Sequence, residues 1–461
     1  MIHASLTKLL LALTFMPITV MAQIPIVHLN GNFGDDYSKG DITITDSEGN
    51  TVAYNVKSKW RGHSSKAFDK KSFAVKLLDE NGEDKDASIL GMREDNNWIL
   101  DAMAVDKARM RNRVSFDLWN DFASDTYIKK DYEPESFNGT HGKFVELYLN
   151  DSYHGIYCLT EKLDRKQLKL KKYKNGVRGV LYKADTWEGT NFYEYKSSYD
   201  NTQPTWMGWA SDYPDVEDEG ETDYGPIYNA ISFVVDSPDN EFETSVASLF
   251  DLPVWNDYFI FIKTILAYDN TGKNTFAYVY DKNEDNRLGI APWDLDATWG
   301  RNYDASETDA SDIYDGHRLL ERLNDTKGYQ EAMAKRYFEL RENVFSADSL
   351  KKRFRNYMSL LGDCGALQRE KERWNGINGI ELDFEKELEY IETWIDKRLE
   401  MLDNYYGKYV TDISNAKIEI EGKPINGDGR IYTLTGQTAD ESCIKAGRLY
   451  IRNGKKFIYR Q

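Results

Sequence analysis

Cysteine and histidine are scarce in this sequence of 461 residues, which holds three of the former and six of the latter. The cysteines (Cys158, Cys364 and Cys443) are far apart and form no C-x-x-C pair, which argues against a structural zinc site. No histidine stands in a metal-ligand pair or in a Ser-His-Asp pattern. The odd number of cysteines leaves at least one thiol unpaired within a monomer, and we expect isolated buried thiols rather than a catalytic cysteine.

Excess positive charge and long internal apolar runs are also missing. Acidic residues outnumber basic ones by 77 to 59, which gives a formal net charge of −18 at pH 7. A field of this sign disfavours nonspecific binding to nucleic acid or to anionic membranes, so we expect no nucleic-acid partner. A G-x-x-x-x-G-K-[ST] loop is absent as well, so a Walker-type nucleotide site is not supported.

The single long apolar stretch lies at the extreme N-terminus. Lys8 precedes an apolar run over 9–20, and Ala22 ends a short segment of small or tolerated residues. This order is typical of a cleavable signal peptide with a cut after Ala22, and the run is short for a membrane span. We therefore expect no transmembrane segment after cleavage, and a secreted or cell-surface protein, with the periplasm as a further destination.

The remaining chain is apolar enough for a packed core, with 41% hydrophobic and 30% charged residues. Alternating apolar patterns and turn residues predict strands at 41–45, 52–56 and 71–78 and hairpins at 143–150/154–161 and 276–280/287–291. Helical spacing predicts helices over 97–122, 255–268 and most of 312–406. Strands, one helix, more strands and then a helical block is an α+β order rather than a regular βαβ alternation.

Two further segments shape the expected domain organisation. Residues 187–225 are acidic, aromatic and rich in turns, which indicates an excursion or lid, or else a solvated loop. After Gly407 the chain changes to short strands with glycine turns. We expect a signal peptide (1–22), a main domain (23–408) and a small all-β C-terminal domain (409–461).

Two acidic segments close in sequence carry the candidate chemistry. Asp269 and Asn274 form D-x-x-x-x-N at the end of a predicted helix, and a predicted hairpin separates them from Asp294 and Asp296 in Pro-Trp-Asp-Leu-Asp. Phosphoryl transfer needs a carboxylate that orients or deprotonates the acceptor hydroxyl, and hard oxygen ligands that hold a divalent cation on the phosphates. Protein kinases use this order of elements. The alternative is a helix end with a capping Asn and turn-capping Asp residues.

Upstream basic residues offer candidate phosphate contacts. A Gly/Ser turn begins at Arg61, and a basic strand behind it carries Lys71 and Lys76. Such a turn can cradle phosphate through backbone N–H groups and one lysine, whereas an edge strand protected by lysines gives the same pattern. Glu161 and Lys162 end a hairpin strand, where the carboxylate orients a phosphate-binding lysine or the two form an ordinary surface pair.

These motifs, taken in order, resemble the CotH kinase family, the atypical protein kinases related to spore coat protein H. The resemblance covers roughly residues 25–405. It rests on the following segments: Arg61-Gly-His-Ser-Ser, Lys70-Lys-Ser-Phe, Asn97-Trp-Ile-Leu, Met110-Arg-Asn112, Val145-Glu-Leu-Tyr-Leu-Asn150, Gly155-Ile-Tyr, Thr160-Glu-Lys162, Tyr268-Asp269, Asn274, Pro292-Trp-Asp-Leu-Asp296 and Gly300.

The resemblance implies an atypical protein-kinase-like α+β fold that binds ATP with Mg²⁺ or Mn²⁺ and phosphorylates protein Ser. It implies a catalytic role for Asp269, metal binding by Asp294 and Asn274, and a metal role for Asp296. The implied nucleotide contacts are Arg61, Lys71, Glu161, Lys162 and Asn274. The choice between Lys71 and Lys76 as the phosphate lysine stays open at this point.

The tail is similar to the small C-terminal β-domains of type IX secretion cargo. The matching segments are Gly429-Arg-Ile-Tyr-Thr-Leu-Thr-Gly436-Gln and Ile444-Lys-Ala-Gly447-Arg-Leu-Tyr-Ile-Arg-Asn-Gly454-Lys-Lys-Phe-Ile. This implies a bacterial surface or secreted protein whose C-terminal domain engages the secretion machinery, whereas the alternative is a generic β appendage.

Three functions are consistent with these patterns. The first is an exported kinase that transfers the γ-phosphate of ATP to protein Ser/Thr. The second is a non-catalytic adhesin on the same scaffold, with 187–225 as its contact surface and an unknown ligand. The third is a metal-dependent hydrolase or carbohydrate-active protein that uses the same Asp residues. The intact pair Asp269 and Asp294 favours the first.

Overall fold

A closed seven-stranded β-barrel forms the N-terminal part of the molecule. The computed structural model describes residues 23–410, 430–432, 438–439, 449–452 and 455–458. The barrel order is β1 (Ile26–Gly31), β2 (Ser38–Thr45), β3 (Thr51–Arg61), β4 (Ser72–Leu78), β7 (Asn97–Asp101), β9 (Ser152–Glu161) and β8 (Gly142–Leu149). Neighbouring strands are antiparallel except β1 and β8, which pair in parallel and close the barrel. The predicted strands at 41–45, 52–56 and 71–78 and the 143–161 hairpin are confirmed.

Alternation of apolar side chains explains the barrel. In β4, Phe73, Val75 and Leu77 are all buried in one core with side chains from the other strands, whereas Ala74 and Lys76 point to the opposite face and are only partly buried. A period of two along each strand therefore gives every strand one core face and one outer face. The outer faces of β3, β4 and β7 carry polar side chains, among which are Arg61 and Asp101.

The predicted helix over 97–122 is wrong in its first part. Residues 97–101 form β7, and helix α1 begins only at Arg111 and ends at Phe122. Trp98 and Leu100 are two residues apart and both enter the barrel core, as alternate residues of a strand do. The apolar residues that follow them have helical spacing, and the prediction extended this helix back over the strand. The connection contains two residues with positive φ, Met103 and Arg109, a conformation that no helix tolerates.

A second, five-stranded sheet has the order β11-β12-β10-β13-β14. Its strands are β10 (Val180–Ala184), β11 (Thr205–Trp206), β12 (Trp209–Tyr213), β13 (Thr275–Val279) and β14 (Gly289–Pro292). The predicted hairpin at 276–291 is thus confirmed as β13 and β14. Residues 187–225, expected to be an excursion or loop, contribute β11, β12 and the short helix α4 (Val216–Glu219), so part of this segment belongs to the sheet.

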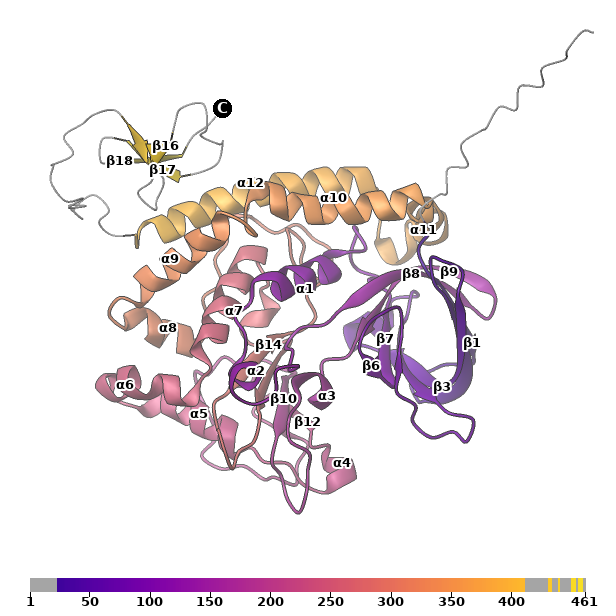
Figure 1. Cartoon of the computed structure of the whole chain (residues 1–461), viewed down its shortest axis with the longest axis horizontal. Coiled ribbons are helices and arrows are strands. Elements are labelled where there is room, and N and C mark those ends of the chain that lie inside the picture. Colours follow the sequence, from indigo (N-terminus) through magenta and orange to yellow (C-terminus); the bar gives the residue numbers. More distant parts are fainter. Residues whose placement is uncertain (1–22, 411–429, 433–437, 440–448, 453–454, 459–461) are drawn as a thin grey trace, which may run out of the picture.

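Helices form most of the second half of the chain. They are α5 (Gly225–Asp236), α6 (Asp239–Leu249), α7 (Leu252–Ile265), α8 (Arg318–Asp325), α9 (Tyr329–Arg341), α10 (Ala347–Asp363), α11 (Ala366–Trp374) and α12 (Phe384–Gly407). Of these, α7 packs on β14 of the five-stranded sheet. In Figure 1, α10 and α12 run side by side along the top edge, and the barrel lies at the right. The predicted helical block over 312–406 is confirmed, and the described chain is a mixed α+β protein. The remaining short elements are α2 (Tyr127–Asp131), α3 (Arg165–Leu168), β5 (Ala87–Ser88) and β6 (Glu94–Asp95).

A buried ion cluster fastens α11 to the barrel. The Glu370 carboxylate accepts hydrogen bonds from Lys70 Nζ, Arg109 Nε and the backbone N–H of Ile156, each at 2.7 Å. The Glu370 side chain is fully buried, and the side chains of both cations are 2% exposed. Because buried charges require partners, this cluster fixes the helix against β9.

Four short antiparallel strands are described in the region of the expected C-terminal domain: β15 (Ile431–Tyr432), β16 (Thr438–Ala439), β17 (Leu449–Arg452) and β18 (Lys455–Ile458). The expected signal peptide, Cys443 and most of the segments similar to secretion cargo lie outside the described residues. Cys158 is buried, Cys364 is partly buried, and both are free thiols. None of the helices described here is long and apolar enough to span a membrane.

Candidate active site

The β13–β14 hairpin brings the two acidic segments together. Asp269 begins a short 3-10 turn after α7, and Asn274 lies directly before β13. Thr275 pairs with Pro292 across the hairpin, and Trp293 N donates to the Asn274 carbonyl at 3.1 Å. Asn274 and Asp294 therefore lie at the same end of two neighbouring strands. The structure thus brings together the D-x-x-x-x-N and W-D-x-D segments that sequence reasoning had linked.

Asn270, to which sequence reasoning assigned no role, joins the two segments directly. Its amide nitrogen donates to the carbonyl of Asn274 at 2.7 Å and to the carbonyl of Trp293 at 2.8 Å. The residue is 3% exposed, and its own carbonyl accepts from the Tyr258 hydroxyl at 2.7 Å. Its position directly after Asp269 is the only sequence signal that could have identified it.

Asp269 lies at the edge of this arrangement, with its side chain 18% exposed. The Asn274 amide nitrogen is 3.5 Å and Lys273 Nζ 4.0 Å from Asp269 Oδ2. Desolvation raises the pKa of Asp269, and the positive charge of Lys273 opposes this rise. A carboxylate with a raised pKa and one accessible edge is suited to accept a proton.

Asn274 and Asp294 both have left-handed backbone conformations, with φ of 52° and 53°. This region is sparsely populated by residues other than glycine, and Asn and Asp tolerate it best. Both side chains are thereby turned out of the regular strand direction at the site. Backbone conformations of this kind cluster at functional positions.

A concentration of negative charge surrounds Asp294 and Asp296. Desolvation raises the pKa of Asp294, and Asp101 and Asp269 raise it further, whereas Arg61 lowers it. The pKa of Asp296 lies well above its ordinary value, because of burial first and then repulsion from Asp294 and Asp101. Asp294 is nevertheless accessible to water.

The chemistry of these donors fits a hard divalent cation. Mg²⁺ keeps several water or phosphate ligands and takes only one or two protein carboxylates, and Asp294, Asp296 and Asn274 offer oxygens of the preferred kind. Among the described residues, no group of three or more Asp, Glu, His or Cys side chains is close enough to hold a metal ion by itself. The donor set therefore fits a cation that is shared with a phosphate-bearing ligand better than an all-protein metal cage.

Asp101 and Asn112, from the barrel and from α1, complete the support of the W-D-x-D segment. Asn112 Nδ2 donates to Asp101 Oδ2 at 2.9 Å, and its Oδ1 accepts from the backbone N–H of Leu295 at 3.1 Å. Leu295 stands between the two candidate metal ligands, so the Asn112 amide holds their backbone. Asn112 belongs to a motif quoted above, but residue reasoning gave it no role, and Asp101 was missed altogether.

Basic side chains approach the acidic group from the barrel. Arg61 ends β3, and its guanidinium carbon lies 5.7 Å from the Trp293 ring centroid. Lys162 follows β9 and pairs with Asp212 of β12 at 3.5 Å, an attraction that raises the pKa of the lysine. Arg61 and Lys162 both act electrostatically on Tyr37. The two predicted basic contacts therefore lie in one neighbourhood.

The two candidate phosphate lysines lie in different surroundings. Lys71 donates to the Lys66 carbonyl at 2.6 Å and lies over the Trp60 ring, so its ammonium is held by the barrel itself. Lys76 lies over the Tyr37 ring at 5.2 Å. Desolvation lowers the pKa of Lys76, with further lowering from Lys57 and Lys162. Lys76 therefore shares the neighbourhood of Arg61 and Lys162, and a nucleotide contact by Lys71 stays a prediction.

Glu161 is separated from any accessible surface. Its side chain is 1% exposed and accepts from the backbone N–H and Nδ1 of His141, from Arg93 N and from Gln167 Nε2. Burial raises the pKa of Glu161, but the hydrogen bonds from His141 and Arg93 outweigh this effect and leave the pKa lowered. The structure therefore places Glu161 in a buried hydrogen-bond cluster, from which it can position Lys162 through the backbone only.

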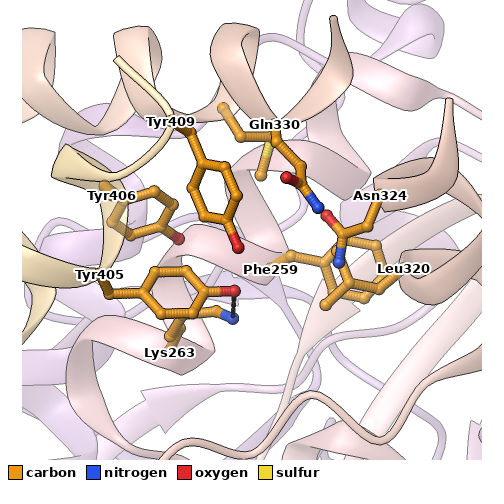
Figure 2. Close-up of a pocket in the computed structure, with 9 residues that line it drawn as sticks. Phe259, Lys263, Leu320, Asn324, Gln330, Tyr405, Tyr406 and Tyr409 are labelled. Carbon is orange, nitrogen blue, oxygen red and sulfur yellow. Dashed lines mark hydrogen bonds between the residues drawn. The ribbon is translucent and has the colours of Figure 1, made fainter. Parts of the chain in front are cut away.

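A separate small cavity lies among α7, α8, α9 and α12. Figure 2 shows Tyr405, Tyr406 and Tyr409 around it, with the Tyr405 hydroxyl hydrogen-bonded to Lys263 at 3.2 Å. None of the predicted site residues lines this cavity. It therefore plays no part in the arrangement around Asp269.

A carboxylate and amide pair on a hairpin, opposed by arginine and lysine side chains, is the type of site that phosphate-transferring proteins use. A sequence model of the CotH kinase protein family matches residues 59–402, and the chain belongs to this family. The matched range contains the barrel from the end of β3, the five-stranded sheet and the helices as far as α12. A comparison with curated proteins gives no match.

Proposed function

We propose that this protein is an exported, kinase-like CotH phosphotransferase that moves the γ-phosphate of ATP to Ser or Thr of a protein. The observation that carries the proposal is the hairpin register, which sets Asn274 and Asp294 side by side next to Asp269. The proposal also rests on membership of the CotH kinase protein family. We also propose that the chain has an atypical protein-kinase fold.

Each residue has a distinct task in this proposal. Asp269 accepts a hydrogen bond from the acceptor hydroxyl and takes its proton as the oxygen attacks the γ-phosphorus, whose bond to the bridging oxygen breaks so that ADP leaves. Asp294, Asp296 and Asn274 would hold Mg²⁺ or Mn²⁺, which neutralises charge on the phosphates when bound. Arg61 and Lys162 contact phosphate oxygens as fixed positive charges.

Two further residues act through their neighbours. Asn270 sets the distance between the strands that carry Asn274 and Asp294, since its amide bridges the carbonyls of both segments. Asn112 fixes the backbone between Asp294 and Asp296. Such support matters because misplacement of a reacting group by about 1 Å can lower a rate about 100-fold.

The predicted export and sorting belong to the same proposal. The N-terminal apolar segment and the tail similar to type IX secretion cargo favour a secreted or cell-surface protein that engages a secretion machinery through its C-terminal domain. The alternative function is a binding protein on the same scaffold. It is favoured by exposed aromatic residues within 187–225, among them Trp187, Tyr193 and Tyr199, which are 38–41% exposed.

The test combines nucleotide binding with phosphate transfer. Purified protein is incubated with γ-³²P-labelled ATP and Mg²⁺ or Mn²⁺, and autophosphorylation and the nucleotide-induced shift in melting temperature are both measured. Asp269→Ala should abolish incorporation of labelled phosphate but keep the nucleotide-induced shift in melting temperature. Asp294→Ala should abolish both. Asp325→Ala, an exposed carboxylate on α8, is the matched control and should behave as wild type.

The outcomes separate the two candidate functions. Label in wild type and in the Asp325 variant, lost in both site variants, supports the kinase. A folded wild-type protein that shows neither label nor a thermal shift with either metal excludes this function and favours the binding protein.

A further inference from the structure

Two exposed aromatic side chains and a third, partly buried one lie in contact next to Asp269 in the chain. We call Trp187, Tyr268 and Tyr314 the aromatic shelf. The ring centroids of Trp187 and Tyr268 are 5.4 Å apart, and those of Tyr268 and Tyr314 are 4.6 Å apart. Tyr268 is 47% exposed and Trp187 is 38% exposed. Contiguous exposed aromatic rings are unusual on a protein surface that meets only water, and they mark interaction sites.

The shelf is a built part of the site. The Trp187 ring lies so close to Gly272 that a Cβ atom there would come within 2.7 Å of it. The Thr190 hydroxyl donates to the Gly272 carbonyl, and the backbone N–H of Asn274 donates to the Ala184 carbonyl at 3.0 Å. The segment 184–190 is therefore fastened along the loop that carries Asp269 and Asn274.

The position of the shelf limits what can lie on it. An acceptor hydroxyl must come within hydrogen-bonding distance of the Asp269 carboxylate. Tyr268 directly precedes Asp269 in the chain, and the Trp187 ring packs on Gly272 of the same loop. Because consecutive Cα atoms are about 3.8 Å apart, the residue next to an acceptor held at Asp269 is within reach of the loop that carries the shelf.

Hydrogen bonding around the shelf favours an apolar occupant. Asp185 is paired with Lys183 at 2.6 Å, and Glu188 with Lys196 at 2.9 Å. Asp312 accepts from the hydroxyl of Tyr314, itself a shelf residue, at 3.3 Å. These three carboxylates thus already have hydrogen-bond partners within the protein. A sugar ring needs free hydrogen-bonding groups around an aromatic platform, which these paired carboxylates do not supply. A peptide side chain needs only the rings.

We propose that the aromatic shelf binds an aromatic or large apolar side chain next to the acceptor Ser or Thr of a protein substrate. This inference rests on the proposed function and adds its substrate class. It makes Trp187 and Tyr268 residues that determine specificity, distinct from the groups that contact the phosphates.

The experiment compares kcat/KM between peptide substrates of one enzyme preparation. Ten-residue peptides with a single Ser carry Phe, Leu, Gly or Glu at the preceding or following position, and phosphate transfer from labelled ATP gives kcat/KM for each. We expect the best Phe peptide to exceed its Gly counterpart about tenfold, a factor that corresponds to about 1.4 kcal/mol and to the loss of an aromatic contact.

Variants assign this preference to the shelf. Trp187→Ala and Tyr268→Ala should reduce the Phe-to-Gly ratio to about one, mainly through KM. Tyr268→Phe keeps the ring and should keep the ratio. Tyr132→Ala removes an equally exposed ring, stacked at 4.6 Å on Tyr280 at the far end of β13, and should also keep the ratio.

The possible results each decide the inference. A ratio near one in wild type, or a ratio that the shelf variants do not change, overturns it and leaves the kinase proposal intact. Transfer to a saccharide panel in preference to every peptide overturns it as well. If wild type neither binds ATP nor transfers phosphate, the kinase proposal fails, and fluorescence anisotropy with the labelled Phe peptide decides: binding lost in Trp187→Ala supports the shelf, and no binding overturns it.

Discussion

Replacing Glu370 by Gln should destabilise the protein far more than a surface substitution of the same chemistry. The carboxylate is fully buried and accepts from Lys70, Arg109 and the Ile156 backbone, all at 2.7 Å. The amide keeps the shape of the side chain but leaves the buried Arg109 without its anion. It also removes the carboxylate that raises the pKa of Lys70, which burial lowers to about 7. Such a loss costs about 3–5 kcal/mol, a large part of the roughly 5–15 kcal/mol by which proteins are stable.

The measurement is urea denaturation followed by tryptophan fluorescence and far-UV circular dichroism. A fall in the transition midpoint at constant slope reports lost stability rather than a changed unfolded state. Glu372→Gln is the control, because Glu372 lies on the same helix, is exposed and accepts only from Gln368 among the bonds described. It should change the free energy of unfolding by less than about 0.5 kcal/mol.

Adding Lys70→Met to Glu370→Gln should recover part of the loss, because one of the two buried polar groups left without the carboxylate is then gone. A loss below about 1 kcal/mol for Glu370→Gln, or one equal to that of Glu372→Gln, would refute the reasoning. The conclusion would then be that water or a rearranged backbone satisfies both cations.

Three other substitutions test separate parts of the structure. Asn270→Ala removes the amide that bridges two carbonyls at the site. We expect kcat for phosphate transfer, measured by incorporation of labelled phosphate, to fall about 100-fold, and Asn270→Gln to lose less. Gly155→Ala should destabilise by more than about 2 kcal/mol in urea, because the residue has φ of 106° and a Cβ there would overlap the Glu370 carboxylate. His317 is buried, and burial lowers its pKa from 6.5 to about 3. As the pH falls, this histidine therefore takes up a proton in the unfolded chain before it does so in the folded one. Stability should therefore fall between pH 6.5 and 3 by up to about 1.4 kcal/mol per pH unit from this group, and His317→Phe should flatten that slope.

Each of these has a contrary result. An Asn270→Ala protein with the kcat of wild type means that the hairpin alone holds the site. A Gly155→Ala protein as stable as wild type means that the Glu370 side chain can move aside. Equal pH slopes for wild type and the His317 variant mean that other groups control acid stability.

Local signals in the sequence were enough to predict the core of the candidate site. D-x-x-x-x-N, a hairpin and W-D-x-D follow one another along the chain, and a hairpin necessarily returns its two ends to one place. The predicted neighbourhood of Asn274 and Asp294 therefore needed no long-range information. The family assignment followed from the same motifs and is confirmed by the match over residues 59–402.

Other parts of the site depend on contacts between distant segments, and these could not be predicted. Asp101 reaches the W-D-x-D segment through Asn112, which requires the register of β7 and the position of α1. The misassigned helix over 97–122 hid this contact. The burial of Glu161 was a second feature that the sequence did not reveal: its side chain is 1% exposed, and a nucleotide contact by it stays a prediction. Sequence patterns report which residue types are present, whereas burial is decided by the fold.

The parallel pairing that closes the barrel also sets an order of events for the growing chain. Val27 in β1 is opposite Leu147 in β8, so the first strand waits for more than a quarter of the chain before its second edge is satisfied. Contacts of such high sequence separation slow folding, and an unpaired strand edge invites pairing with other chains. A fragment that ends before Gly142 keeps β1 to β4 and β7 as an open sheet and should aggregate. The barrel can close only after β9, which joins β7 to β8, has also been made.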